Sequence, residues 1–231
     1  MAKKPITISN TGLTLLEDCP RCFWLQYRQG IRRPEGPVSR LANRYDSVIK
    51  KYFDLYRAIS ELPPMVEGSL RGSLYPNFGI DRTKAGYIPS RLYADLAPGY
   101  KLVGILDELL IDGDRRFSPV DHKTSSAAPV GEPPVYPSYT RQLDIYDYLL
   151  GENGHATNGI GYLIFFRLGE RARQDHEFQH VVTVKRFDTD ASRPKPLLEQ
   201  AVEILKGSLP EASPACGFCT YFRARQDVAV S

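Results

Sequence analysis

The chain has 231 residues, enough for one large domain or for a core with a small helical insertion. Hydrophobic residues make up 42% and charged residues 25%, as in an ordinary soluble globular protein, and no apolar run approaches the length of a transmembrane helix. The net charge of +3, from 30 basic and 27 acidic residues, permits nucleic-acid binding but is too mild to argue for it.

Helices and strands alternate along the predicted chain. In chain order we expect a helix or broken helix over 9–29, a helix over 38–62, an irregular stretch over 65–96, strands over 102–111 and 116–123, a helix over 138–150, strands over 159–168 and 178–187, and a helix over 195–209. This order predicts an α/β protein. We expect one domain over 1–231, with an N-terminal helical part over about 9–62, a core over about 95–187, and a C-terminal helix and cysteine segment over about 194–225.

Two acids and a lysine fall on a predicted β-hairpin, whose strands flank the turn signal Asp112-Gly113-Asp114. If the loop is centred on Asp114, Asp107 and Asp121 lie opposite each other, and the period of two in a strand places Asp121 and Lys123 on one face. Carboxylates this close repel each other unless a proton or a cation lies between them, and Mg²⁺ prefers such oxygen ligands. Alone, the pattern is equally compatible with ordinary polar residues on an exposed strand face.

The helix after the hairpin adds two polar residues at helical spacing. We expect this helix to begin with Ser138 as its N-cap and to end at Leu150, with Gly151 just past the end. Gln142 and Tyr146 are four residues apart, so they share one helix face. Strand, turn, strand and helix therefore follow in order, with polar residues at fixed offsets.

The four cysteines form two C-x-x-C pairs, Cys19 with Cys22 and Cys216 with Cys219. Two such pairs can complete a tetrahedral set of thiolates around a metal. No signal peptide is visible after Met1, so we expect a cytoplasmic protein, in which structural disulfides are rare. Metal or cluster ligation is therefore the favoured interpretation, and it would join the two ends of the chain.

Other candidate residues have two interpretations. A basic and aromatic cluster near the first cysteine pair suits contacts to single-stranded nucleic acid, but a solvated basic face over buried aromatic rings is favoured. Its members are Arg21, Trp24, Tyr27, Arg28, Arg32 and Arg33. His122 lies between Asp121 and Lys123 and points to the opposite face of its strand, so a neutral core or surface histidine is favoured over a ligand.

Three motifs in this order resemble the PD-(D/E)xK nuclease superfamily, in its RecB-like and CRISPR-associated exonuclease branch. In that branch a "G-x-x-D" strand precedes a "D-x-K-T" strand and a helix carrying "Q-x-x-x-Y". This chain has Gly104-Ile-Leu-Asp107, Asp121-His-Lys-Thr124 and Gln142-Leu-Asp-Ile-Tyr146. The resemblance implies a restriction-endonuclease-like central mixed β-sheet flanked by helices, with the N- and C-terminal segments joined by the four-cysteine site.

The resemblance also implies roles for the site residues. Asp107 and Asp121 would bind Mg²⁺ or Mn²⁺, Lys123 would be the catalytic lysine, and Gln142 and Tyr146 would support them near the nucleic-acid backbone. In the family a histidine or an acid on the long N-terminal helix often completes the metal site. Asp46 falls in that stretch, and its being an ordinary solvated helix residue is equally compatible with the sequence.

Relatives in this branch often carry a [4Fe–4S] cluster on one N-terminal cysteine and a C-terminal "C-x-x-C-x5-C". Here Arg225 stands where the last cysteine is expected, and Cys22 supplies a fourth thiolate instead. Four thiolates suit a [4Fe–4S] cluster, which we favour by the resemblance, or Zn²⁺ as the alternative.

The function implied is that of a metal-dependent nuclease that hydrolyses the phosphodiester bonds of DNA. It would be an exonuclease of DNA repair, recombination or CRISPR adaptation, acting on DNA that is single-stranded or has free ends. Protein partners in a repair or CRISPR complex are compatible with this function. The alternative is a catalytically silent module of the same fold that binds nucleic acid or a partner and carries a structural Fe–S or Zn site.

Overall fold

The computed structural model describes residues 4–34, 40–79, 82–125, 131–172 and 178–229, and the chain forms two compact units. The first unit comprises Met1–Val38, Tyr93–Val103 and Pro194–Ser231, and the second comprises Ser39–Leu92 and Gly104–Arg193. The first unit therefore combines both ends of the chain with a central segment. The predicted N-terminal helical part does not coincide with either unit, because the boundary at residues 38–39 divides it.

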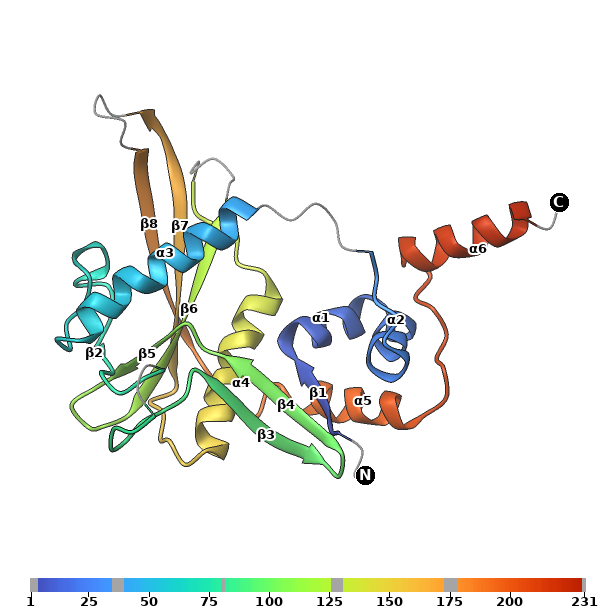
Figure 1. Cartoon of the computed structure of the whole chain (residues 1–231), viewed down its shortest axis with the longest axis horizontal. Coiled ribbons are helices and arrows are strands. Elements are labelled where there is room, and N and C mark those ends of the chain that lie inside the picture. Colours follow the sequence, from blue (N-terminus) through green and yellow to red (C-terminus); the bar gives the residue numbers. More distant parts are fainter. Residues whose placement is uncertain (1–3, 35–39, 80–81, 126–130, 173–177, 230–231) are drawn as a thin grey trace. The chain divides into compact units, whose positions relative to one another are not determined.

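The second unit is built on a five-stranded mixed sheet (Figure 1). Its strand order is β2-β5-β6-β7-β8, and the strands are β2 Ser73–Leu74, β5 Glu108–Ile111, β6 Phe117–Ser125, β7 Ile160–Ala172 and β8 Phe178–Asp188. The neighbours β6 and β7 are parallel, whereas the other neighbours are antiparallel. Helix α4, Pro137–Glu152, connects β6 to β7, as a parallel pair requires a crossover of this kind.

The alternation of side chains along β6 serves two different layers of the second unit. His122 faces helix α3, Arg40–Arg57, where its ring centroid lies 4.7 Å from that of Phe53. The next-door Asp121 faces α4 and accepts a hydrogen bond from Tyr146. One strand thus presents polar groups both to α3 and to α4, and this places the candidate site at β6.

The apolar core of the second unit lies between α3 and the sheet. Its buried members are Ile49, Phe53, Val66, Leu70, Leu74, Leu110, Val120, Tyr162, Ile164 and Phe166. Phe53 is fully buried, and burial of a side chain of this size contributes roughly 1.5–3 kcal/mol. A short 3₁₀ turn, Pro64–Val66, follows α3 and contributes to the same core.

The first unit contains a small sheet and the terminal helices. Strands β1 (Ile6–Ser9), β4 (Tyr100–Ile105) and β3 (Arg91–Ala97) are neighbours in that order, and β1 is parallel to β4. The helical segments are α1 Asn10–Asp18, α2 Pro20–Trp24, a π-helical turn Leu25–Gln29, α5 Lys195–Lys206 and α6 Gly217–Ala229. Ser9 caps α1, because its hydroxyl accepts the N–H of Gly12.

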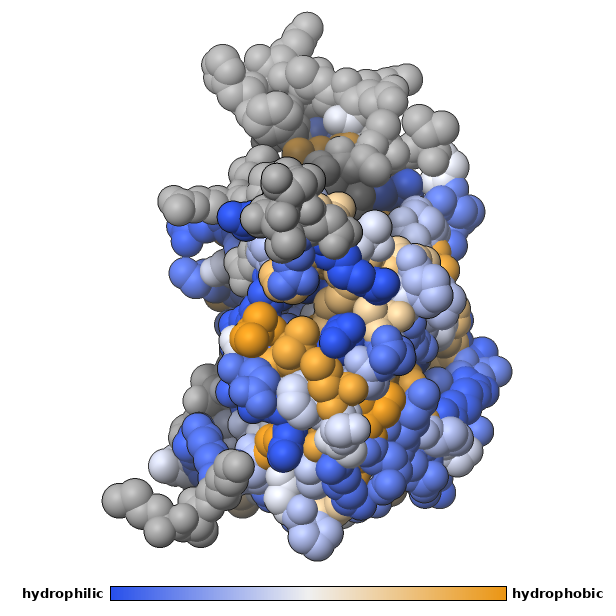
Figure 2. Space-filling model, turned by 90° about the vertical axis from the view of Figure 1, so that its right-hand side faces the viewer, coloured by the Kyte–Doolittle hydropathy of each residue, from blue (hydrophilic) through white to orange (hydrophobic). Residues whose placement is uncertain are grey.

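Polar side chains dominate the face of the molecule in Figure 2, where a group of apolar side chains is exposed near the middle. Among the exposed large apolar residues of the first unit are Phe218, Tyr221 and Phe222 of α6. Within the described residues, no helix is both long and apolar enough to cross a membrane.

The fold class is confirmed: the sheet is mixed and helices cover it. The register of the hairpin is also confirmed, because pairs from Glu108 with Val120 to Ile111 with Phe117 are all centred on residue 114. The broken helix over 9–29 and the pairing of the last two strands agree with expectation as well.

Three local predictions are wrong. The expected single strand over 102–111 is interrupted at 106–107, where the chain leaves the small sheet as β4 and enters the large one as β5. Helix α4 begins at Pro137 with Tyr136 as its N-cap, instead of Ser138, since proline at the first helical position needs no N–H partner. The helix also runs past Gly151 to Glu152, and a further helix, α6, carries Cys219 where no helix was expected.

Candidate active site and cysteine site

Lys123 lies at the centre of a polar network on the α4 side of β6. Its ammonium is 2.5 Å from Oδ2 of Asp121 and donates to Oε1 of Gln142 at 2.8 Å. It also lies 4.3 Å from the ring centroid of Tyr139, which favours a cation over its face. These contacts hold a partly buried positive charge in one place.

Tyr146 closes the network from the middle of α4. Its hydroxyl accepts a hydrogen bond from Nε2 of Gln142 and lies 2.6 Å from the carbonyl oxygen of Ile105 and 3.1 Å from Oδ1 of Asp121. The single hydroxyl proton can be donated to only one of these oxygens at a time. Both ends of the Gln142 amide are thus engaged, and the Tyr146 hydroxyl fixes the orientation of the Asp121 carboxylate.

Gly104 explains how α4 comes this close to the strand. A Cβ atom at Gly104 would lie 2.5 Å from Cδ1 of Leu149 and 3.1 Å from two ring carbons of Tyr146. The glycine of the "G-x-x-D" motif therefore permits the approach that brings Tyr146 to Asp121.

Asp107 lies at the break between β4 and β5 and is held from two sides. Its Oδ2 accepts the backbone N–H of His122 at 2.8 Å, and its Oδ1 lies 2.8 Å from the ammonium of Lys50. The same ammonium is 2.9 Å from Oδ2 of Asp46, one turn earlier on α3. Asp46 thus reaches the candidate site. Lys50 also belongs to the site, although the sequence analysis did not predict it; the only signal for it is its position four residues after Asp46 on the same helix.

The electrostatic surroundings of the Asp107 and Asp121 carboxylates favour a bound cation. Burial raises the pKa of Asp121 to about 6, a shift that Lys123 opposes and that the neighbouring charge of Asp107 increases. Burial also raises the pKa of the Tyr146 hydroxyl well above its ordinary value, and the Asp121 and Asp107 charges add to the shift. Oδ2 of Asp121 is buried, and the ammonium of Lys123 is its ion-pair partner. A divalent ion would relieve this repulsion, so the residues fit a metal site.

His122 does face away from Asp121 and Lys123, as predicted, and is buried against the rings of Phe53 and Phe166. Burial lowers the pKa of its imidazole to about 4, so the ring is neutral at pH 7. A ring nitrogen of His122 and a carboxylate oxygen each of Asp46 and Asp107 lie within 4.8 Å of one another.

Against known families, the model of the PD-(D/E)XK nuclease superfamily matches residues 76–224, about two thirds of the chain and the stretch that holds Asp107, Asp121, Lys123, Gln142 and Tyr146. The chain belongs to the PD-(D/E)XK nuclease superfamily. This assignment confirms the resemblance and supports a nuclease function. No curated protein matches the chain at a significant level.

Solved structures similar to this superfamily member include that of SSO0001, with 15% identity over 94% of this chain and 82% of that one, at a TM-score of 0.44. The complex of LHK-Exo with dAMP has 11% identity over 97% and 94% of the two chains, at a TM-score of 0.39. An alkaline exonuclease, LHK-Exo, from Laribacter hongkongensis has 10% identity over 99% and 96%, at a TM-score of 0.40. At these TM-scores the similarities add nothing to the argument, and the assignment rests on the family match.

The two cysteine pairs of this PD-(D/E)XK protein converge in the first unit. The Sγ atoms of Cys22 and Cys219 are 3.6 Å apart, those of Cys22 and Cys216 are 3.7 Å apart, and those of Cys19 and Cys219 are 3.9 Å apart. All four sulfur atoms lie within 4.8 Å of one another, and none is in a disulfide. The predicted convergence of the four cysteines is therefore observed.

Several groups around the cysteines stabilise negative charge. Arg33 donates to Sγ of Cys216 at 3.2 Å and also pairs with Asp18. Burial raises the pKa of the Cys19 thiol, but hydrogen bonds from the backbone of Cys22 and Ser213 and from neighbouring thiols lower it by more, to about 7. Burial raises the pKa of the Cys22 thiol, and burial and the neighbouring thiols raise that of Cys219 to about 12, so a bound metal would have to displace these protons.

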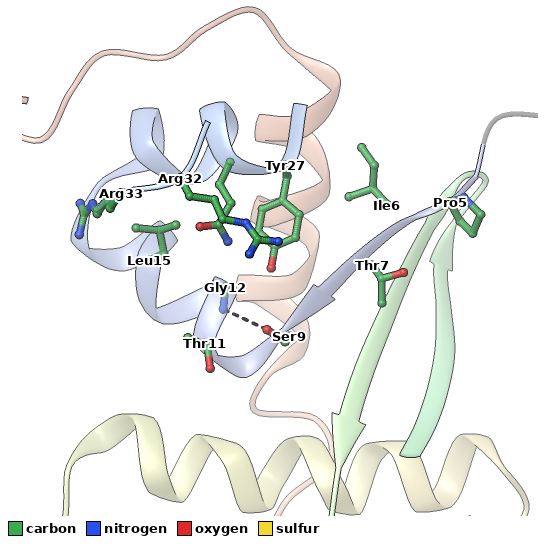
Figure 3. Close-up of a pocket in the computed structure, with 11 residues that line it drawn as sticks. Pro5, Ile6, Thr7, Ser9, Thr11, Gly12, Leu15, Tyr27, Arg32 and Arg33 are labelled. Carbon is green, nitrogen blue, oxygen red and sulfur yellow. Dashed lines mark hydrogen bonds between the residues drawn. The ribbon is translucent and has the colours of Figure 1, made fainter. Parts of the chain in front are cut away.

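Both aromatic members of the basic and aromatic cluster have structural contacts. The indole N–H of Trp24 donates to the carbonyl oxygen of Gly207, and the ring of Tyr27 packs 4.8 Å from that of Phe23. Figure 3 shows the hydroxyl of Tyr27 directed at the start of α1, where a Cβ at Gly12 would lie only 2.1 Å from it. Beside Tyr27, Arg32 borders a pocket of about 670 Å³ in the first unit.

Proposed function

We propose that this protein is a metal-dependent nuclease that hydrolyses phosphodiester bonds of DNA. The observation that carries the proposal is the position of the Lys123 ammonium between Asp121 and Gln142, with Asp107 close enough to Asp121 to influence its pKa. Two carboxylates that need a cation, beside a fixed ammonium, are suited to a substrate whose reaction builds negative charge on a phosphate.

Asp107 and Asp121 would hold the divalent ion, with Asp46 as a further ligand. The ion would supply Lewis acidity and a bound water of lowered pKa. Lys123 is held in the network by Asp121 and Gln142 and would stabilise the charge that develops on the phosphate or orient the attacking water. Gln142 positions Lys123, and Tyr146 positions Asp121. The Mg²⁺ or Mn²⁺ dependence, the DNA substrate and the preference for single strands or free ends rest on the RecB-like motifs.

The test is hydrolysis of end-labelled single- and double-stranded DNA and of an RNA of the same sequence, with Mg²⁺, Mn²⁺ or EDTA. We expect cleavage of linear DNA that EDTA abolishes, and no cleavage of a covalently closed circle. Lys123→Ala should lower kcat on the order of a hundredfold or more, as loss of a fixed charge-stabilising group does. Lys101→Ala, which removes an exposed ion pair with Asp95, is the control.

Equal rates for Lys123→Ala and the parent protein would refute this mechanism. If the parent binds DNA but does not cleave it with either ion, the catalytically silent alternative is correct. Cleavage of RNA alone would correct the substrate and leave the mechanism intact.

We further propose that the cysteine site binds one zinc ion. A tetrahedral ion with Zn–S bonds of about 2.3 Å places its sulfur ligands about 3.8 Å apart. The separations of 3.6, 3.7 and 3.9 Å agree with this value. In a [4Fe–4S] cluster each thiolate binds a different iron, so the sulfur atoms lie farther apart. The spacing therefore favours zinc over the [4Fe–4S] cluster.

Metal analysis and the visible spectrum of protein purified without oxygen test this proposal. One zinc per chain and a colourless protein are expected. Several irons per chain with a visible absorption band would establish the cluster instead. Co²⁺ exchanged into the site should give the absorption of a tetrahedral tetrathiolate, and Cys22→Ser should change that spectrum.

A further inference from the structure

The region between α3 and β6 holds polar groups that the proposed nuclease mechanism does not use. Both ring nitrogens of His122 are buried and have no hydrogen-bond partner among the described residues. The side chain has only 7% of its surface exposed. A neutral imidazole has one donor and one acceptor, and leaving such groups unsatisfied in an apolar layer is costly. An unsatisfied pair of this kind in a folded protein calls for an unseen partner.

The groups nearest to this imidazole are carboxylates. One oxygen from Asp46 and one from Asp107 lie within 4.8 Å of a ring nitrogen of His122 and of each other. Ligand atoms bound at about 2.1 Å to an octahedral ion lie about 3.0 Å apart when adjacent and about 4.2 Å apart when opposite. The upper limit of 4.8 Å exceeds these two spacings by about 1.8 Å and 0.6 Å, so small movements of the side chains would bring the three atoms to ligating distance.

Lys50 supplies the cation that these carboxylates require. Its ammonium lies 2.8 Å from Asp107 and 2.9 Å from Asp46, so it bridges the two carboxylates. A divalent ion in place of this ammonium would draw the two oxygens inward by roughly 0.7 Å, from hydrogen-bond to coordination distance.

We propose that Asp46, Asp107 and His122 form a mixed oxygen–nitrogen site for a divalent transition-metal ion, whose place the Lys50 ammonium takes when the ion is absent. The proposal rests on the proposed nuclease function, because it shares Asp46 and Asp107 with that metal centre, and it names Lys50 as the group that competes with the ion. The ligand types also determine which metal ion the site selects. Imidazole nitrogen suits transition metals, whereas Mg²⁺ prefers oxygen, so the site favours Mn²⁺ over Mg²⁺.

The backbone supports this assignment. The N–H of His122 donates to Oδ2 of Asp107, so the carboxylate is fixed to the same residue whose ring faces α3. The rings of Phe53 and Phe166, at centroid distances of 4.7 and 5.3 Å, hold the imidazole in its plane and exclude water. Ligands fixed in this way need little ordering on binding.

The direct test is electron spin-echo spectroscopy of Mn²⁺ bound to the intact protein, which detects nitrogen coordinated to the ion. The parent protein should show nitrogen modulation, and His122→Phe should lose it. His155→Phe is the matched control, because His155 also packs against a phenylalanine ring but lies outside the cluster. The measurement requires no catalytic turnover, so it is independent of the hydrolysis test.

Calorimetry gives the second readout. His122→Phe should weaken Mn²⁺ binding roughly ten- to a hundredfold and change Mg²⁺ binding little. Lys50→Met should strengthen Mn²⁺ binding, whereas Lys51→Met, with the same charge change at the exposed neighbouring position, should not.

Absence of nitrogen modulation in the parent protein would overturn the proposal, even if His122→Phe failed to fold. So would equal strengthening by Lys50→Met and Lys51→Met, since that would reveal a general charge effect. If the parent shows the modulation but does not cleave nucleic acid, the metal site stands and the nuclease function fails.

Discussion

Replacing Gly104 by alanine tests how α4 is positioned on the strand that precedes Asp107. The new methyl group would lie 2.5 Å from Cδ1 of Leu149 and 3.1 Å from the ring of Tyr146, whereas carbon atoms pack favourably at about 3.5–4.0 Å. Leu149 is fully buried and Tyr146 is 2% exposed, so neither side chain can swing aside into solvent. The helix or the strand must therefore shift.

Overpacking by one methyl group in a well-packed core costs about 1–3 kcal/mol. The overlap of roughly an ångström with Leu149 predicts a loss of unfolding free energy in the upper half of that range, about 2–3 kcal/mol. The shift would also separate the hydroxyl of Tyr146 from Asp121, so metal binding and hydrolysis should fall together with stability.

Urea unfolding measures the first effect as a lower midpoint at an unchanged slope. Gly113→Ala is the control, because a methyl group there would meet no atom within 4 Å. The double variant with Leu149→Ala should recover part of the loss, because it removes the closest contact. If Gly104→Ala and Gly113→Ala unfold at the same midpoint, α4 does not pack on the strand as described.

Three further predictions concern stability. Burial lowers the pKa of the His122 imidazole from 6.5 to about 4, so between these values only the unfolded chain binds the proton. As pH rises from 4 to 6.5 in EDTA, the parent should gain about 3 kcal/mol of unfolding free energy relative to His122→Phe, and a difference that does not change with pH would contradict this. Burial raises the pKa of Glu108, the buried partner of Arg57, to about 7, so at pH 8 this carboxylate is charged. At that pH Arg57→Met should lower the free energy of unfolding by about 3–5 kcal/mol, and adding Glu108→Leu should restore much of the loss in a double-mutant cycle. Removing the metal from the cysteines with a strong chelator should lower the melting temperature of the parent and leave that of Cys22→Ser unchanged; equal shifts would place the chelated metal elsewhere.

The local signals of the sequence were sufficient for the hairpin and for the helix that follows it. The Asp112-Gly113-Asp114 turn fixed the register of β5 and β6, and the period of two then placed Lys123 beside Asp121. Spacing four residues apart placed Gln142 and Tyr146 on one face of α4, where both reach the site. These features depend on residues that are close together in the sequence, so the periodicity of strands and helices is enough to predict them.

The α3 side of the site depends on tertiary packing and could not be predicted in the same way. The period of two in β6 placed His122 on the face opposite Asp121, and the family resemblance offered Asp46 as a ligand, but the sequence did not indicate that Lys50 would bridge Asp46 and Asp107. The break at Asp107 escaped prediction for a related reason. Its apolar flanks suit one continuous strand, and only the pairing of β4 with β1 and of β5 with β6 separates them.

The separation of the two cysteine pairs in the sequence determines when, during synthesis, their site can be completed. Cys22 and Cys216, whose sulfur atoms lie 3.7 Å apart, are 194 residues apart in the sequence, so the first pair leaves the ribosome long before the second exists. At a synthesis rate of about 5–20 residues per second, roughly 10 to 40 s pass between the first pair and the second, and during that time only half of the four cysteines are present. A nascent chain that stops short of Cys216 can never complete the set. If the cysteines bind the proposed zinc ion, metal loading of the first unit would distinguish a chain with both cysteine pairs from one that stops before the second pair.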